Sequence, residues 1–566
     1  MSKILITSAL PYINGIKHLG NLVGSMLPAD VYARYMRMTG NDVLFICATD
    51  EHGTPAELGA VEKGQSTEAF CEEQHNLQEE IYQKFNLSFD FFGRSSAPQN
   101  HELTKHFAEK LEANGYIEER EIKQVYSLDD NRFLPDRYII GTCPYCGYEA
   151  ARGDQCENCT KLLDPTELIN PRSAVSGSSR LEVKMSKHLF LKLPLMEETL
   201  RKWINSKFEW PQIVTSIAKK WLDEGLHERC ITRDLNWGVS VPKEGYEGKV
   251  FYVWFDAPIA YISATKQWSD QKPDARNYKD WWQGGDDVKY VQFMAKDNIP
   301  FHTIIFPATI FGSDENWKQP DYIKGFNWLT FYGGKFSTSS KRGIFTNQAL
   351  SEFPADYWRY WLMSNAPESS DSSFTFSSFA GTVNKDLNDV LGNFVSRVLK
   401  MTASKVGSFV PAAGDFNDDD KELFANLKKR IADYSSYLGA MEYRKALVEL
   451  RAIWVEGNNY LTKAAPWTVI KTDEARAKTI LNIAINLIRI NAVLAMPIIP
   501  STSKTILNAL GIEAENIKWL SDDIVKEFCY LKEGHKFDVP EQIFQKIPQE
   551  SIDELVTKYG GEETVS

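Results

Sequence analysis

Four cysteines stand close together in the segment TCPYCGYEAARGDQCENC. They form two CxxC pairs, Cys143 with Cys146 and Cys156 with Cys159, with nine residues between the pairs. Each CxxC places two thiolates on one tight turn, and two such turns complete a tetrahedron around a metal ion. Two disulfides are the alternative, but the other four cysteines are isolated, which favours reduced thiols in a cytosolic protein. We therefore predict a structural zinc knuckle over about residues 141–162, with no open coordination position.

A second group of polar side chains follows the first predicted strand. In ALPYINGIKHLGN, His18 and Asn21 stand at the predicted start of a helix, and Asp50 ends the next strand, DVLFICATD. Parallel sheets bind ligands outside the carboxyl ends of their strands, beside helix N-termini. A lone loop histidine is more often an ordinary side chain than a catalytic one, and no GxGxxG fingerprint of a dinucleotide site is present. Both loops nevertheless belong to one edge of the predicted sheet.

The loop GGKFSTSSKRG, from Gly333 to Gly343, also belongs to this edge because it follows the last sheet-like segment. It holds Lys335, a run of serine and threonine, and then Lys341 and Arg342. Its composition cannot build a hydrophobic core. A loop of this kind is either a plain surface connection or a segment that closes on phosphate, and the residues alone leave both open.

These loops depend on an interrupted parallel sheet. Residues 3–7 and 42–50 are apolar and β-prone, and a helical pattern ending at Gly40 lies between them, which makes a βαβ unit. Sheet-like patterns return at 250–258, 288–297 and 303–308, and helical patterns replace them further on. We predict an α/β fold: a doubly wound, Rossmann-like catalytic domain with a zinc-knuckle insertion, followed by an all-α helical bundle. The expected boundaries are 1–115 and 231–325 for the catalytic halves, 116–230 for the insertion, 326–380 for a linker, 381–545 for the bundle and 546–566 for a tail.

The composition is that of a soluble globular protein. Of 566 residues, 43% are hydrophobic and 25% charged, and no apolar run approaches the length that spans a bilayer. The formal net charge of −12 argues against non-specific coating of nucleic acid but leaves a local basic contact open. We expect no membrane partner and a cytoplasmic location.

The ordered motifs resemble those of class I aminoacyl-tRNA synthetases, specifically the methionyl-tRNA synthetase family. Residues 18–21 (HLGN) are similar to the signature HIGH, and residues 335–339 (KFSTS) to KMSKS. ALPY, ATDEHGTP, TRDLNWGV, YVWFDAPIAY and AKDNIPFH also follow the family, so the resemblance covers about residues 1–545. Two positions depart from it: Asn21 can donate a hydrogen bond but carries no charge, and Thr338 replaces a lysine. Lys341 or Arg342 is our candidate for the missing cation.

The resemblance implies a ligase that uses ATP with Mg²⁺ to form methionyl-adenylate and then charges tRNA(Met). The implied catalytic residues are His18, Asn21 and Lys335. The implied ATP contacts are His18, Gly20, Asn21, Lys335, Ser337, Thr338 and Ser339. The implied L-methionine pocket consists of Leu10, Tyr12, Asp50, Trp254, Ala257, Pro258, Tyr261 and His302, where aromatic rings suit a thioether and Asp50 pairs with the ammonium group. Core packing is the alternative for the aromatic residues.

The helical half carries the implied anticodon contacts. Asn393 and Arg397 are four residues apart and so share one helix face, and Pro466 and Trp467 stand at a predicted helix start. The family resemblance implies that these residues read the anticodon by stacking and by hydrogen bonds to base edges. A buried tryptophan and a solvated polar pair are the alternative. We expect a monomer, because no further dimerising domain follows residue 545.

Two other functions compete with this prediction. One is an adenylate-forming enzyme that never binds tRNA; it predicts no role for Trp467. The other is a zinc-knuckle tRNA-binding protein without catalysis; it predicts no amino-acid-dependent reaction with ATP.

Overall fold

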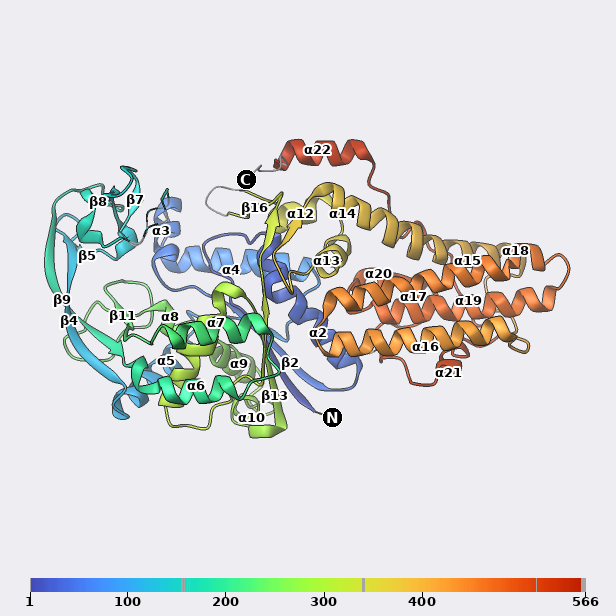
Figure 1. Cartoon of the computed structure of the whole chain (residues 1–566), viewed down its shortest axis with the longest axis horizontal. Helices are drawn as coiled ribbons and strands as arrows, with labels where there is room; N and C mark the ends of the chain where they lie inside the picture. The colour runs from blue at the N-terminus through green and yellow to red at the C-terminus, as the bar shows by residue number, and fades with distance from the viewer. Residues whose placement is uncertain are drawn as a thin grey trace.

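The computed structural model describes residues 2–153, 156, 158, 159, 161, 163–337, 342–515 and 517–560. A five-stranded parallel sheet lies near the middle of the elongated molecule, in the order β14-β13-β1-β2-β3 (Figure 1). Its strands are β1 Lys3–Ser8, β2 Asp42–Thr49, β3 Phe91–Arg94, β13 Val288–Ala295 and β14 Tyr322–Phe326. The two strands predicted at 3–7 and 42–50 are confirmed as β1 and β2. The chain runs from β1 to β2 and β3 on one side and reaches β13 and β14 on the other, so the topological switch point lies between β1 and β13.

Helices cover the sheet and form its connections. The first crossover is one continuous helical run in which a π-helical turn separates two α-helical pieces; its parts are α1 Leu19–Asn21, η1 Leu22–Met26 and α2 Leu27–Met38. The other helices of this part are α3 Thr54–Lys63, α4 Thr67–Lys84, α5 Pro98–Ala113, α6 Glu197–Asn205, α7 Gln212–Asp223, α8 Val253–Asp256, α9 Ala260–Asp270, α10 Lys279–Trp282, η7 Phe301–Ile305 and α11 Phe306–Gly312.

Two of the predicted sheet segments are wrong. Residues 250–258 form only the short strand β12 Val250–Phe251 before α8 begins, and residues 303–308 lie in η7 and α11. Both segments are short, apolar, and rich in aromatic or β-branched residues. Periodicity cannot separate a buried strand from a buried helix over so few residues. The sheet is completed instead by β3 and β14.

The insertion is built on a long antiparallel ribbon, which lies at the end of the molecule opposite the helical bundle (Figure 1). The ribbon pairs β4 Ile117–Ser127 with β9 Leu181–Leu191, flanked by β5 Arg132–Phe133 and β10 Arg229–Cys230. A small sheet beyond it consists of β6 Ile139–Thr142, β7 Ala151–Arg152 and β8 Ile169–Ser173. The segment predicted as insertion also contains α6 and α7, and α7 packs on the edge strand β14 of the five-stranded sheet. The short pair of β11 Thr232–Arg233 and β12 leads back to the part of the chain that carries this sheet.

A small sheet and several helices lead to the bundle. The sheet consists of β15 Leu329–Phe331, β16 Gly334–Lys335 and β17 Ser372–Phe374; the helices are α12 Thr346–Glu352, α13 Ala355–Ser364, α14 Phe376–Thr382 and η8 Val383–Gly392. The bundle contains α15 Asn393–Lys405, α16 Asp418–Gly439, α17 Tyr443–Ala464, α18 Pro466–Val469, α19 Glu474–Ala495, α20 Pro500–Ala509 and α21 Ile524–Phe528. The helix α19 is long and apolar enough to cross a membrane, but its apolar window is 94% buried among the other helices, as in the central helix of a bundle.

The C-terminal segment differs from the predicted tail. Residues 549–559 form helix α22 (Gln549–Tyr559), which buries Ile552 and Leu555. Tyr559 lies beside the ring of Phe376 on α14 and donates a hydrogen bond to Glu352 at 2.6 Å. The high content of charged residues concealed this apolar face. Residues 561–566 lie outside the described part of the chain.

A buried arginine joins the sheet domain to the helices that follow it. Arg359 on α13 and Asp30 on α2 are both fully buried and form an ion pair at 2.7 Å. The remaining donors of this guanidinium reach backbone carbonyl oxygens of the sheet domain and of the loop after α19, namely those of Phe85, Pro497 and Ile498, at 2.8–3.0 Å. The carboxylate also accepts hydrogen bonds from Arg34 and Ser88. This buried ion pair is tolerated because the guanidinium of Arg359 and the carboxylate of Asp30 both have further hydrogen-bond partners.

We expect Arg359→Leu to lower the free energy of unfolding by about 3–5 kcal/mol, because removing one partner leaves a buried charge uncompensated. Urea unfolding followed by tryptophan fluorescence measures this. The half-exposed Arg430, which pairs with Glu449 and Glu456, supplies the matched control. Arg430→Leu should cost less than about 1 kcal/mol. Equal costs for the two variants would contradict the assignment of Arg359 as the link.

Candidate active site and metal centre

A cavity of about 560 Å³ opens at the carboxyl edge of the sheet, at the switch point between β1 and β13. Its walls come from the loop after β1, the end of β2, the α8–α9 turn, η7 and the β15–β16 hairpin. All residues predicted to contact methionine line it: Leu10, Tyr12, Asp50, Trp254, Ala257, Pro258, Tyr261 and His302. Four of the predicted ATP contacts do so as well: His18, Gly20, Asn21 and Lys335. Three polar loops, far apart in the sequence, therefore meet at one place.

Of the remaining predicted ATP contacts the structure describes Ser337, which is not among the residues of the cavity wall. Ser337 pairs through its backbone with Arg342, and Thr338, Ser339 and Lys341 lie outside the described residues. The guanidinium of Arg342 donates to the carbonyl oxygen of Phe331 at 3.0 Å and lies against Gly334. Arg342 is not among the residues that line the cavity, so the structure gives no support to Arg342 as a cation for phosphate.

His18 and Asn21 cap the first helix reciprocally. The backbone N–H of Asn21 donates to Nδ1 of His18, and the backbone N–H of His18 donates to Oδ1 of Asn21, both at 3.2 Å. Nδ1 of the neutral ring therefore carries no proton, and Nε2–H is the available donor. Burial, assisted by the nearby charge of Lys17, lowers the pKa of His18 to about 4. The ring of Phe336 stacks on His18 with centroids 4.7 Å apart, which joins the two signature segments directly.

Asp50 provides a buried carboxylate in the cavity wall. Its side chain is 5% exposed, and its Oδ1 atom has no hydrogen-bond partner in the described part of the chain. Burial, with the charges of Asp256 and Glu51, raises the pKa of Asp50 well above its usual range, and Lys17 opposes this shift. A buried carboxylate with an unsatisfied oxygen favours a cationic ligand, because pairing offsets the cost of burying the charge.

Sequence reasoning missed several residues of the wall. Lys17 is 6% exposed and donates from Nζ to Oδ1 of Asn14 at 2.9 Å. Burial lowers the pKa of Lys17 to about 7, partly offset by Asp50. The position of Lys17, directly before His18 in the loop after β1, was the signal that could have identified it. The other missed residues include Asp297, Phe301 and Trp328.

The inner end of the cavity is aromatic and uncharged. The Tyr261 hydroxyl lies 2.8 Å from Nε2 of His302, and Nδ1 of His302 lies 2.8 Å from the carbonyl oxygen of Asn298. Because a carbonyl can only accept, Nδ1 carries the proton and Nε2 accepts from Tyr261. Burial lowers the pKa of His302 to about 4, so the ring is neutral near pH 7. Trp254 is 38% exposed and meets Phe301 edge to face, which leaves part of its ring open to the cavity.

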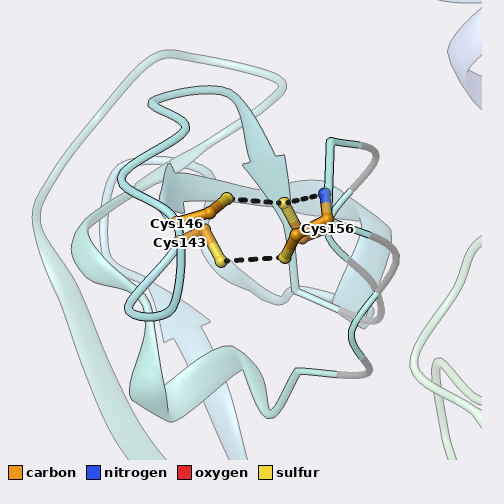
Figure 2. A group of neighbouring side chains, drawn as sticks. Cys143, Cys146 and Cys156 are labelled. Atoms are coloured by element: carbon orange, nitrogen blue, oxygen red, sulfur yellow. Dashed lines mark hydrogen bonds between the residues drawn. The ribbon is translucent and has the colours of Figure 1, made fainter.

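The four predicted cysteine ligands converge at the far end of the insertion. Figure 2 shows sulfur atoms from the two CxxC turns facing one another. The Cys143–Cys159 and Cys146–Cys156 sulfurs are 3.8 and 3.6 Å apart, and all four lie within 4.8 Å of one another. Tetrahedral Zn–S bonds of about 2.3 Å require sulfur separations of about 3.8 Å. All four thiols are free. This donor set therefore fits a zinc ion and leaves no ligand position open.

Two of the four residues predicted to read an anticodon, Arg397 and Trp467, meet on the helical bundle. The Arg397 guanidinium lies 5.2 Å from the ring centroid of Trp467, and both line a shallow hollow between α15, α17 and α19. Trp467 is 40% exposed, whereas Pro466 is buried at the start of α18. Asn393 lies one turn before Arg397 and donates to the carbonyl oxygen of Asp389 at 3.2 Å. An exposed ring held by a cation is available for stacking.

Comparison with known proteins gives consistent matches over the whole chain. Residues 4–399 match the family model of class I (M) tRNA synthetases, and residues 410–564 match that of the anticodon binding domain of methionyl tRNA ligase. Methionine–tRNA ligase of Streptomyces avermitilis is 55% identical, covering 99% of this chain and 100% of the relative. That of Cereibacter sphaeroides is 57% identical, and each chain is covered completely.

Solved structures share the fold. Mycobacterium tuberculosis methionyl-tRNA synthetase in complex with methionyl-adenylate has a TM-score of 0.77 at 24% identity, covering 96% of this chain and 100% of that one. Its apo form has a TM-score of 0.72 at 23% identity, covering 97% and 99%.

Proposed function

The chain belongs to the class I methionyl-tRNA synthetase family and ligates methionine to tRNA with ATP, and we propose that the cavity at the carboxyl edge of its sheet is where it forms methionyl-adenylate. The observation that carries this proposal is Asp50, a buried carboxylate with an unpartnered oxygen in a cavity whose inner end is aromatic. A zwitterionic amino acid with an apolar side chain matches this wall, because its ammonium group satisfies Asp50.

The aromatic end suits the methionine side chain. Sulfur–ring contacts contribute about 0.3–1.5 kcal/mol each, and Tyr12, Trp254 and Tyr261 offer ring faces or edges. Leu10, Ala257 and Pro258 complete the apolar surface. The hydrogen bond between Tyr261 and His302 occupies both polar groups, so neither needs a polar partner from the substrate.

The chemistry requires positioning more than covalent help. An oxygen of the methionine carboxylate attacks the α-phosphorus of ATP, and pyrophosphate leaves with the electron pair of the broken P–O bond. A terminal hydroxyl of tRNA then attacks the carbonyl carbon and gives up its proton to water, and AMP leaves with the electron pair of the broken C–O bond. Nε2–H of His18, held by the cap with Asn21, can donate to a phosphate oxygen, and Lys335 offers a positive charge from the β15–β16 hairpin. Mg²⁺ bound to ATP supplies further charge neutralisation.

We expect Asp50→Asn to raise the Kd for methionine about 100-fold, because the buried ammonium loses its counter-charge while the shape of the site is kept. Isothermal titration with the purified chain measures this. Asp42→Asn at the exposed start of β2 is the matched control and should leave the Kd unchanged. Unaltered binding by Asp50→Asn would show that the ammonium binds elsewhere.

The bundle is proposed to read the tRNA(Met) anticodon through Asn393, Arg397, Pro466 and Trp467. Stacking of a splayed base on an exposed aromatic ring contributes about 1–3 kcal/mol. We expect Trp467→Ala to reduce methionylation of tRNA(Met) about 100-fold while leaving methionine-dependent ATP–pyrophosphate exchange intact. Charging assays with saturating ATP and methionine test this. If wild-type protein charges no tRNA(Met), the proposed function fails; if Trp467→Ala charges normally, only the anticodon assignment fails.

We also propose that Cys143, Cys146, Cys156 and Cys159 hold one structural zinc ion. Free thiols in such proximity are typical of a reducing compartment, which supports the proposed cytoplasmic location. Metal analysis of the purified protein should give one zinc per chain, and the pair of substitutions Cys143→Ser and Cys156→Ser should abolish it. Cys529→Ser, outside the cluster, should retain the metal. Full zinc content without the two buried cysteines would refute the site.

A further inference from the structure

The cavity wall carries few positive charges for a site that must hold a carboxylate beside a triphosphate. Among its described residues, Lys17 and Lys335 are the only lysines or arginines. The wall histidines, His18 and His302, are neutral near pH 7, because burial lowers the pKa of each to about 4. The described arginine of the neighbouring loop, Arg342, is turned toward the Phe331 carbonyl.

The two lysines occupy different environments. Lys335 is exposed, and its ammonium lies 4.6 Å from the ring centroid of Trp328 at the outer edge of the cavity. Lys17 is buried, and the only hydrogen bond that its ammonium group makes in the described structure is to the neutral amide of Asn14 at 2.9 Å. An ammonium group has three donors, so two of them remain for a ligand.

The backbone around Lys17 is fixed. Its carbonyl oxygen accepts hydrogen bonds from both the backbone N–H and the hydroxyl of Thr346 on α12, at 2.9 and 2.8 Å. The next residue, His18, begins the first helix and is tied to Asn21. The lysine therefore directly precedes the N-cap residue of a helix and shares the cavity wall with the buried carboxylate of Asp50 and with His18, the proposed hydrogen-bond donor to phosphate. Electrostatic coupling of Lys17 to both residues is consistent with this placement.

We propose that Lys17 is a catalytic residue: its ammonium contacts the methionine carboxylate and then the α-phosphate that this carboxylate attacks. The inference rests on the proposed function of the cavity and adds a residue to it. Without substrate, Lys17 and Asp50 influence each other electrostatically in the cavity wall. When the methionine ammonium pairs with Asp50, the substrate carboxylate is the charge that still needs a partner, and Lys17 is the buried cation that the wall offers it.

The ammonium group of Lys17 contacts both reacting groups of adenylate formation, first the methionine carboxylate and then the α-phosphate. As the carboxylate oxygen forms its bond to the α-phosphorus, negative charge moves from the carboxylate onto the phosphate oxygens, and pyrophosphate departs with the electron pair of the broken bond. Because the ammonium group of Lys17 is fixed where the carboxylate meets the α-phosphate, it stays paired with negative charge throughout the transfer. Such pre-organised charge is the largest contribution to catalysis in many enzymes.

The test compares two ligands on two proteins. L-methioninol retains the ammonium and the thioether of methionine but lacks the carboxylate. We expect Lys17→Met to weaken binding of methionine at least about tenfold more than binding of methioninol, because only methionine presents the charge that Lys17 meets. In single-turnover experiments at saturating methionine and ATP, Lys17→Met should form adenylate about 100-fold more slowly. Lys17→Arg, which keeps the charge, should recover part of this rate.

Two controls separate this role from a structural one. Lys63→Met, at an exposed lysine paired with Glu73, should match wild type in all measurements. Lys17→Gln, which can still bond Asn14, should behave like Lys17→Met and replaces it if the latter does not fold. Equal losses for methionine and methioninol, or an unchanged adenylate rate in either neutral variant, would overturn the proposal. Absence of methionine-dependent adenylate formation in wild type would instead overturn the proposed function.

Discussion

The site depends on a backbone pairing that extends beyond the catalytic sheet. The parallel strands β1 and β2 end at Ser8 and Thr49, but Asp50 still pairs with the loop after β1. The N–H of Asp50 donates to the carbonyl oxygen of Pro11, and the N–H of Ile13 donates to that of Asp50, both at 2.9 Å. This pairing fixes the buried carboxylate against the loop that carries Lys17 and His18. Side chains more than thirty residues apart are therefore placed in one cavity by main-chain hydrogen bonds.

Burial then determines the charge of each group. Desolvation disfavours charge on the wall histidines and makes them neutral donors and acceptors of fixed tautomer. Burial also disfavours the charges of Asp50 and Lys17, and the charge of each residue partly offsets this effect on the other. A zwitterionic substrate can offer an ammonium group to Asp50 and a carboxylate to Lys17 without adding net charge to the site. A site of this kind discriminates by pairing charges and by the aromatic surface for the side chain, which makes covalent catalysis unnecessary.

The sequence predicted which polar residues meet in the cavity and in the cysteine cluster better than it predicted the elements between them. Asp50 and His18 were identified because the ends of parallel strands share an edge, and the cysteine spacing predicted a cluster that the structure forms. The strand predicted at 303–308 was wrong because a short apolar segment has no period to distinguish it from a buried helix. Lys17 was missed because its importance comes from burial, which a single residue in a loop does not reveal. The apolar face of α22 was hidden by its charged neighbours.

Arg359 extends this arrangement to the bundle, since its partner Asp30 lies on the helical run that His18 caps. The central claim remains that the cavity activates methionine. The most direct measurement is exchange of labelled pyrophosphate into ATP by the wild-type protein with each of the twenty amino acids in turn. The account predicts that methionine supports the fastest exchange by a wide margin. A faster exchange with any other amino acid, or none with methionine, would contradict it.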